Sequence, residues 1–137
     1  MLDRIWGRVE KVESKLRNRF GNSIDTPWQR FLSHVHFQLM DHGFLRVLWT
    51  NFYQFSPNAF RSNQPSPRRL KKYKELGVKT IINLRGTPKQ SHYLFEQEAC
   101  DALGLVLINC SMWARACTPK KYFIELFDYF DKIEGPF

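Results

Sequence analysis

Cysteine is scarce in this chain of 137 residues, which contains only Cys100, Cys110 and Cys117. No two of them form a Cys-x-x-Cys pair, and no histidine stands near them at the spacing of a metal-binding motif. The sequence therefore predicts neither a structural zinc site nor a disulfide framework, and we expect no metal ion. A small and odd number of cysteines is typical of a reducing compartment.

A long apolar run is also missing. The first twenty residues carry charges throughout and lack the uninterrupted apolar segment that a signal peptide or a membrane span requires. The length of the chain suits one domain with its own core and is too short for us to expect two complete ones. We therefore expect a soluble, cytoplasmic protein.

Acidic residues are nearly absent from the middle of the chain. The formal net charge at pH 7 is +8, and this charge is unevenly distributed. Residues 61–90 contain nine Lys or Arg against one acidic residue, whereas residues 91–137 contain four against seven. A concentrated positive field favours anionic partners, which include phosphorylated molecules, nucleic acid and an acidic membrane surface.

Residues 1–50 have the pattern of a helical region. Over residues 3–20, apolar residues recur every three or four positions with Arg and Lys between them, which predicts an amphipathic helix. This helix packs on its own domain or on a partner, or it attaches the protein peripherally to an acidic membrane surface. The turn-forming sequence "GNSIDTP" breaks the pattern, and a second helix is expected over residues 28–49. Its three histidines are expected to be structural, because no two are four residues apart.

Residues 51–137 have the pattern of a separate compact unit. Two short strands are expected around a Ser-Pro-Asn turn at residues 56–58. A basic helix then begins at Pro67 after a Ser66 cap and ends at Gly77. Apolar strands are expected over residues 78–84 and 105–109.

Two further helices are expected in this unit, one over residues 91–103 with Gly104 as its stop, and one from Thr118-Pro119 to Gly135-Pro136. Strict alternation of strands and helices predicts an α/β fold with a parallel sheet and flanking helices, and Phe137 should open another strand. The side chains expected to face inward or to share one face are Leu70, Tyr73 and Leu76 in the first helix, Leu94, Phe95, Ala99 and Ala102 in the second, and Phe123, Leu126, Phe127 and Phe130 in the third.

Polar residues follow the strand at residues 78–84, at the carboxyl end where functional groups of open α/β sheets collect. Arg85 either binds phosphate oxygens through its guanidinium group or braces the sheet edge by pairing with a carbonyl or carboxylate. Asn83 and Arg61 are expected to orient loops rather than to contact a substrate.

Two quoted stretches carry a resemblance to a known family. "FSPNAFRSNQPSPRRLKKYKELGVKTIINLRG" and "LGLVLINCSMWARACTPKKYFIELFDYFDKIEGPF" resemble the amino-terminal half of the cysteine-based dual-specificity and protein-tyrosine phosphatases, above all the small bacterial members. The resemblance covers about residues 51–137, and residues 28–50 resemble the lead-in of those proteins. Its most specific part is the turn Arg61-Ser62-x-x-Pro65 combined with the strand end Asn83-Leu84-Arg85.

The resemblance implies hydrolysis of phosphomonoesters through a cysteinyl-phosphate intermediate, without a metal or any other cofactor. The family's nucleophile stands in a His-Cys-x5-Arg loop after the next strand, where a helix amino terminus and cations lower its pKa. The 137 residues contain no such sequence, so we expect the phosphatase-like domain to be incomplete, truncated before this loop, and inactive by itself. The expected substrates are a phosphorylated protein or a small phosphorylated molecule.

The segment after the strand at residues 105–109 departs from the family. Arg115 follows Cys110 after four residues instead of five, and the intervening residues include no glycine that would let the backbone wrap a phosphate. The family's general acid, commonly an aspartate here, has no counterpart, because residues 109–121 contain neither Asp nor Glu. Arg115 is kept as a candidate for the phosphate site, together with Arg85, Asn83 and Arg61.

Two hypotheses for the function therefore stand beside each other. The first is the amino-terminal part of a phosphatase. The second is a noncatalytic module or inactive phosphatase remnant that holds anions with the basic helix at residues 67–76. Nucleic acid is not the expected ligand, because a basic patch binds phosphate backbones generically and the chain shows no recognised nucleic-acid motif.

Overall fold

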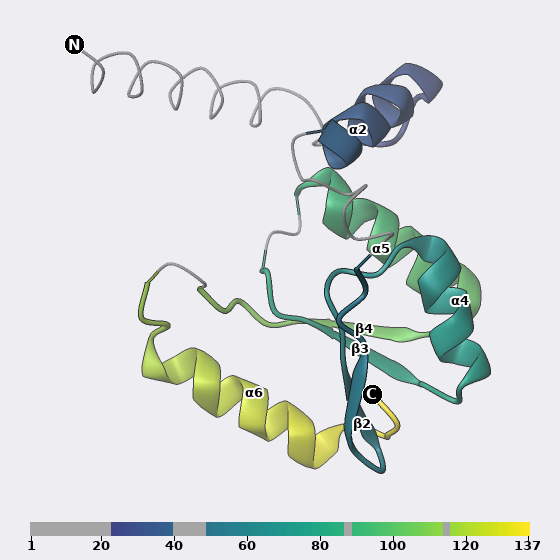
Figure 1. Cartoon of the computed structure of the whole chain (residues 1–137). Helices are drawn as coiled ribbons and strands as arrows, with labels where there is room; N and C mark the ends of the chain where they lie inside the picture. Colours follow the sequence, from purple (N-terminus) through teal and green to yellow (C-terminus); the bar gives the residue numbers. More distant parts are fainter. Residues whose placement is uncertain (1–22, 40–48, 87–88, 114–115) are drawn as a thin grey trace.

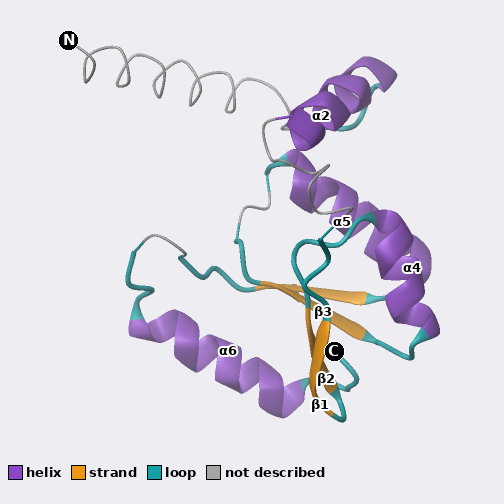
Figure 2. Cartoon of the chain, viewed as in Figure 1, coloured by secondary structure: helices purple, strands orange, loops and turns teal. Residues whose placement is uncertain are grey.

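The structure, a computed structural model, describes residues 23–39, 49–86, 89–113 and 116–137 (Figure 1). This part of the chain is a mixed α/β structure with four helices and two small two-stranded sheets (Figure 2). The helices are α2 (Pro27–Leu39), α4 (Pro67–Glu75), α5 (Ser91–Leu103) and α6 (Lys120–Lys132), and the strands are β1 (Tyr53–Ser56), β2 (Ala59–Arg61), β3 (Thr80–Asn83) and β4 (Val106–Asn109). None of the described helices is both long and apolar enough to cross a membrane.

Strands β1 and β2 form an antiparallel hairpin, with Gln54 opposite Phe60. The turn falls at the expected Ser-Pro-Asn sequence, which confirms the hairpin prediction. Phe52 stacks on both Phe60 and Tyr73, with ring centroids 5.3 and 4.8 Å apart. These aromatic contacts attach the hairpin to helix α4.

Helix α4 begins and ends where the sequence predicts. Pro67 is its first residue and Gly77, at φ +90°, follows its end in the left-handed region that glycine tolerates. Leu70 is fully buried and Tyr73 is buried. The prediction for Leu76 is wrong, because 58% of this residue is exposed. It lies six residues after Leu70, which is about 120° away around a helix of 3.6 residues per turn.

Strands β3 and β4 pair in parallel through helix α5, as the alternating pattern predicts, and Ile81 lies opposite Leu107. Helix α5 ends at Gly104, which is left-handed at φ +61°. The prediction for Ala102 is wrong, since Ala102 is exposed. It lies one turn beyond Glu98, to which Arg30 of α2 donates a hydrogen bond. A core between the sheet and the helices contains Leu70, Tyr73, Val78, Cys100 and Leu105, with Ile81, Ala99 and Leu107 packed against it.

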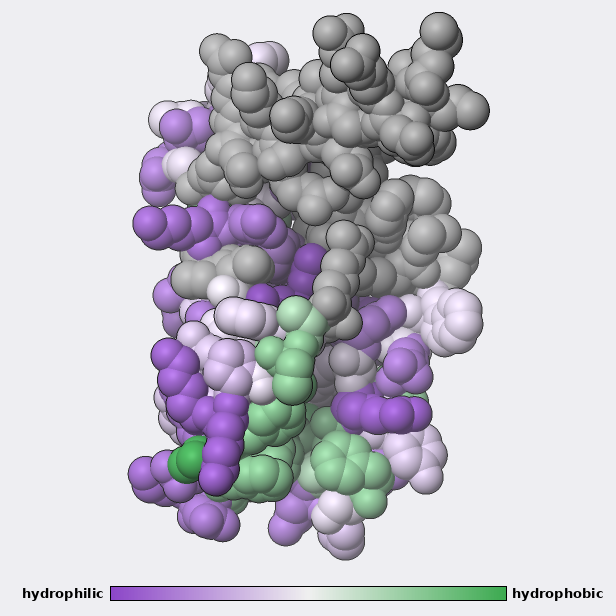
Figure 3. All heavy atoms as spheres, turned by 90° about the vertical axis from the view of Figure 1, so that its left-hand side faces the viewer, coloured by the Kyte–Doolittle hydropathy of each residue, from purple (hydrophilic) through white to green (hydrophobic). Residues whose placement is uncertain are grey.

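Helix α6 lies on the opposite side of the β3–β4 pair from α4 and α5 (Figure 1). It starts after Pro119 as expected, but none of its residues is buried. The space-filling view shows the side of the molecule on which α6 lies, and apolar side chains gather in the lower part of this face (Figure 3). The most exposed apolar side chains of α6 are Phe123, Ile124, Phe127 and Phe130.

The expected end of α6 at Gly135-Pro136 is wrong. The helix stops at Lys132, and Ile133 is already extended. The residues after α6 hydrogen-bond to β3 and to the residue before it. Thr80 Oγ1 donates to the Glu134 carbonyl (3.3 Å), and the Lys79 amide donates to the Pro136 carbonyl (2.8 Å).

Helix α2 is capped by a reciprocal pair. The Gln29 amide donates to Thr26 Oγ1 (3.2 Å) and the Thr26 amide donates to Gln29 Oε1 (3.1 Å), which is the capping-box arrangement. The predicted helix over residues 28–49 is too long at its end, because Trp49 is not helical. Residues 40–48 lie outside the described residues, as does the predicted amphipathic helix at residues 3–20.

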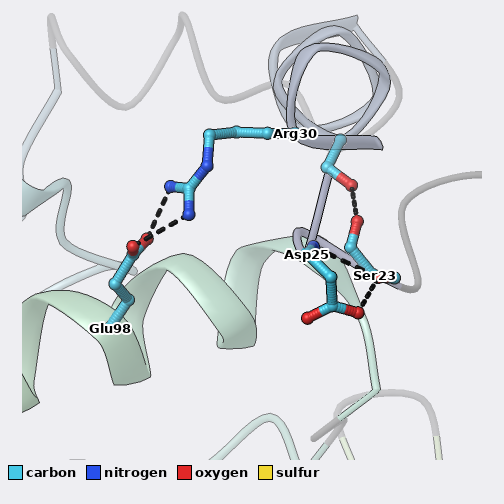
Figure 4. A network of polar contacts seen from close by, with 5 residues as sticks. Ser23, Asp25, Arg30 and Glu98 are labelled. Carbon is cyan, nitrogen blue, oxygen red and sulfur yellow. Dashed lines mark hydrogen bonds and ion pairs between the residues drawn. The ribbon is translucent and has the colours of Figure 1, made fainter. Parts of the chain in front are cut away.

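Helix α2 is attached to α5 by polar and aromatic contacts. Arg30 forms two hydrogen bonds to Glu98, at 2.8 and 2.9 Å (Figure 4). His34 stacks on Phe95, and His36 Nδ1 lies 3.1 Å from Ser91 Oγ. The structural role expected for these two histidines is confirmed, whereas His42 lies outside the described residues.

Candidate functional site

The carboxyl end of β3 holds four polar side chains that contact one another. We call Gln64, Asn83, Arg85 and Glu96 the β3-end cluster. Gln64 comes from the loop after β2, Asn83 and Arg85 from the end of β3, and Glu96 from helix α5. Elements that are distant in the sequence thus meet at the edge where a parallel sheet gathers functional groups.

Asn83 is the buried centre of this cluster, with 5% of its surface exposed. Its Nδ2 donates to Glu96 Oε2 (3.1 Å), and its Oδ1 accepts a hydrogen bond from the Arg85 amide (2.8 Å). The second contact folds the loop back on the strand end, as asparagine side chains do in Asx turns. This contact favours the loop-orienting role expected for Asn83, which stays a prediction.

Gln64 connects the loop after β2 to the other two segments. Its Oε1 accepts a hydrogen bond from Arg85 Nη1 (2.9 Å), while its Nε2 donates to Glu96 Oε2 (2.9 Å). The two sequence stretches Arg61–Pro65 and Asn83–Arg85 are therefore joined directly in the fold. Both stretches were singled out in the sequence, but the contact between them was not predicted.

Glu96 is a carboxyl group inside the protein, with 3% of its surface exposed. Burial raises the pKa of this carboxyl group to about 7, and the nearby Arg85 charge opposes the rise. Near neutral pH, Glu96 is thus poised between its protonated and its charged form. A carboxyl group whose pKa is near the pH of the solution can both donate and accept a proton, whereas an exposed glutamate is already ionised at this pH.

The loop after β2 is held by residues that the sequence did not single out for a site. Arg69 Nη1 donates to Asn63 Oδ1 and Arg69 Nη2 donates to the Thr50 carbonyl, both at 2.9 Å. The Ser62 and Tyr73 hydroxyl groups lie 2.8 Å apart. These contacts fix the Arg-Ser-x-x-Pro turn against helix α4 and so place Gln64.

The loops after β3 and β4 lie against each other. The Met112 amide donates to the Leu84 carbonyl (2.8 Å). Gly86 adopts φ +62°, and a Cβ atom there would lie 2.6 Å from the Ser111 Cα atom. Only glycine satisfies both requirements, so Gly86 permits the close approach of these two loops.

A cavity of about 520 Å³ lies beside the cluster and extends along β3 to the end of the chain. Arg85, Asn83 and Glu96 line one part of it, and Phe60, Phe130 and Phe137 line another. The cavity therefore has a polar part and an apolar part. A cavity of this kind, with a few convergent polar groups and a perturbed pKa, is the usual form of a binding site.

The remaining candidates differ in their placement. Arg61 lines the same cavity, but its guanidinium group lies over the Tyr53 ring, 5.4 Å from the centroid. This contact favours the loop-orienting role expected for it. Arg115 lies outside the described residues.

The buried cysteines are poor nucleophiles. Burial raises the pKa of Cys100 to about 12 and also raises the pKa of Cys110, whose Sγ lies 3.7 Å from the Tyr122 carbonyl. A thiolate is therefore disfavoured at both positions. In the described part of the chain, no three His, Cys, Asp or Glu side chains come together so as to hold a metal ion.

Gln64 and Glu96 are the site residues that the sequence interpretation missed. A signal for Glu96 exists, because it stands one turn before Cys100 on the buried face of α5, where an acidic residue is unusual. Gln64 offers no such signal, since it is one of two unspecified residues in a turn. No protein-family model, curated protein or solved structure matches the chain.

Proposed function

We propose that these residues form the amino-terminal part of a phosphatase of the cysteine-based dual-specificity and protein-tyrosine type, which hydrolyses phosphomonoesters through a cysteinyl-phosphate intermediate. The proposal depends on one observation above all. The two sequence motifs that carry the resemblance meet through the Arg85–Gln64 hydrogen bond beside a cavity at a strand end. Parallel α/β sheets use this edge for ligand binding.

Arg85 is the residue to which we assign phosphate binding. Its backbone is held by Asn83 and its guanidinium group by Gln64, so it is positioned before any ligand arrives. A positioned guanidinium group suits phosphate oxygens in geometry and in charge. Glu96, through Asn83 and Gln64, is assigned a positioning role beneath it.

The nucleophile is assigned to a segment outside these 137 residues, because the sequence contains no His-Cys-x5-Arg and the pKa values of Cys100 and Cys110 are raised. The proposed substrate is a phosphorylated protein or a small phosphorylated molecule. The proposed mechanism uses no metal.

The test is the hydrolysis of p-nitrophenyl phosphate by the polypeptide that includes the coding sequence after Phe137. Turnover is expected for that polypeptide and not for residues 1–137 alone. Arg85→Ala should lower kcat/KM by about a hundredfold to a thousandfold, the range for loss of one donor to a transition-state anion. Arg68→Ala removes the same charge from an exposed position on α4 and should leave kcat/KM unchanged. Equal effects of the two substitutions would refute the assignment of Arg85.

The exposed basic face of helix α4 favours a second candidate function, a noncatalytic anion-binding module. Arg68, Lys71 and Lys72 are exposed on the side of α4 away from the buried Leu70. Lys74 is exposed beside that stripe, and its Nζ donates to the Gly104 carbonyl (3.3 Å). This function predicts association with a polyanion that weakens steeply with salt, and no turnover of any phosphomonoester. Exchanging Lys71 and Lys72 for Gln would then abolish binding, whereas a phosphatase would keep its kcat on a small aryl phosphate.

A further inference from the structure

Arg85 and Glu96 are groups of opposite charge that line the same cavity. Arg85 is exposed to solvent, whereas only 3% of the surface of Glu96 is exposed. An anion that enters the cavity therefore meets a guanidinium group that is exposed and a carboxyl group that is buried. When this carboxyl group is charged, it repels the anion and attracts Arg85, and both effects weaken anion binding.

A single amide group joins the two side chains. Gln64 Oε1 accepts a hydrogen bond from Arg85 Nη1 (2.9 Å), and Gln64 Nε2 donates one to Glu96 Oε2 (2.9 Å). Glu96 Oε2 also accepts a hydrogen bond from Asn83 Nδ2 (3.1 Å). Both amides are neutral, so Arg85 is the cation that favours the ionised form of Glu96.

Other titratable groups surround Glu96 on its own helix and on the elements packed against it, which are α4, α2 and β4. Strand β4, which is described in full, has no titratable side chain. The charge of Glu96 acts on Tyr93 and Cys100 of α5. The buried or half-buried titratable side chains of the three helices, Glu96 aside, are His92, Tyr93 and Cys100 on α5, Arg69 and Tyr73 on α4, and Arg30 and His36 on α2.

We infer that the β3-end cluster binds an anion and a proton together, the anion at Arg85 and the proton at Glu96. The anion is a phosphoryl group, and each of the two ligands strengthens the binding of the other. The inference rests on the assignment of phosphate binding to Arg85 in the proposed function, but it does not require the phosphatase reaction. It makes Glu96 the residue that sets the pH range in which the site is occupied.

The direction of the coupling follows from the charges. Burial raises the pKa of Glu96 to about 7, and the Arg85 charge opposes this rise. An anion at Arg85 offsets the positive charge and adds a negative one, so it raises the pKa of Glu96 further. By reciprocity, a proton on Glu96 must strengthen anion binding by the same factor. Anion affinity is therefore highest at acidic pH and falls as the pH rises through 7.

Inorganic sulfate is the probe, because it stays doubly charged from pH 5 to pH 9, whereas a phosphate ester gains or loses a proton near pH 6. Sulfate is added to the chain of residues 1–137 at pH 5.5 and at pH 8.5, with chloride used to keep the ionic strength constant. The dissociation constant is measured from the NMR shift of the Arg85 amide. The NMR shift of the Glu96 side-chain carboxyl carbon, followed over pH with and without sulfate, reports the protonation of Glu96 itself.

Sulfate is expected to bind about threefold to tenfold more weakly at pH 8.5 than at pH 5.5, and to move the titration of Glu96 upward by the corresponding half to one pH unit. Glu96→Gln should bind sulfate equally well at both pH values. Glu98→Gln, which removes an exposed carboxyl group two positions away, should keep the full pH dependence. Arg85→Ala should abolish the binding, whereas Arg68→Ala should retain it.

Three results would overturn the inference. Sulfate binding at Arg85 that leaves the titration of Glu96 unchanged would refute the coupling but not the assignment of Arg85. A pH dependence that persists in Glu96→Gln would assign the proton to another group, such as His36 or His92. If no sulfate binding depends on Arg85 at either pH, both the inference and the assignment of Arg85 are wrong, and hydrolysis by the extended polypeptide would then have to use other residues.

Discussion

Replacing Glu96 by glutamine should make the protein more stable at alkaline pH. The pKa of the Glu96 carboxyl group is raised from its ordinary value of 4.5 to about 7 because the group is buried. Folding therefore favours its protonated form. The stabilising contribution of this protonated group is complete below pH 4.5 and is lost as the pH rises through 7.

The size of the effect follows from the difference between the two pKa values. A rise from 4.5 to about 7 corresponds to about 3 kcal/mol of stability lost between those pH values. Glu96→Gln removes the titrating group but keeps an oxygen that can accept the hydrogen bonds of Asn83 and Gln64. We expect the variant to exceed the unmodified protein by up to about 3 kcal/mol at pH 8 and to match it near pH 5.

Urea unfolding of both proteins from pH 4 to pH 9 measures this difference. Glu98→Gln is the matched control, because Glu98 lies two positions away on α5, is exposed and is paired with Arg30, which lowers its pKa. Its effect should be small and of opposite sign. Arg85→Ala should raise the pKa of Glu96 further, since the Arg85 charge opposes the rise. A Glu96→Gln variant whose stability changes with pH as in the unmodified protein would refute the reasoning.

Two further substitutions test the core and the loops by the free energy of unfolding, each with a control. Leu70→Ala, at a fully buried position, should cost about 2–5 kcal/mol, whereas Leu76→Ala, at an exposed one, should stay within about 0.5 kcal/mol; equal losses would contradict the core described here. Gly86→Ala should cost at least about 3 kcal/mol, because a left-handed backbone and the Ser111 Cα atom both oppose a Cβ there. The backbone at Gly104 is also left-handed, but open space surrounds this residue, so Gly104→Ala should cost only about 1–2 kcal/mol. A larger loss at Gly104 than at Gly86 would be inconsistent with this packing.

Local signals in the sequence predict most of the elements. Pro67 and Gly77 enclose α4, Gly104 ends α5, and the β-branched strands pair in parallel, all as expected. These features depend on the backbone preferences of a few residues, which a sequence displays directly. The failures occur where tertiary packing decides. Ala102 is exposed although it shares a helix face with the buried Phe95, so its position on that face did not determine its burial.

The candidate site could be predicted only in part. The position of Arg85 and Asn83 at a strand end follows from the sequence, because parallel sheets place such residues at one edge. Their partners do not follow from it, since Gln64 and Glu96 lie 21 residues before Arg85 and 13 residues after Asn83. Contacts of this kind are set by how helix α5 and the loop after β2 pack on the sheet. The raised pKa of Glu96 is a consequence of that packing.

The nucleotide sequence after the codon for Phe137 tests the central claim most directly. The account predicts an in-frame segment that codes for an apolar strand, followed by His-Cys-x5-Arg. Such a sequence would bring a nucleophile to the β3-end cluster. A stop codon directly after Phe137, or a reading frame without this loop, would contradict the assignment to a cysteine phosphatase.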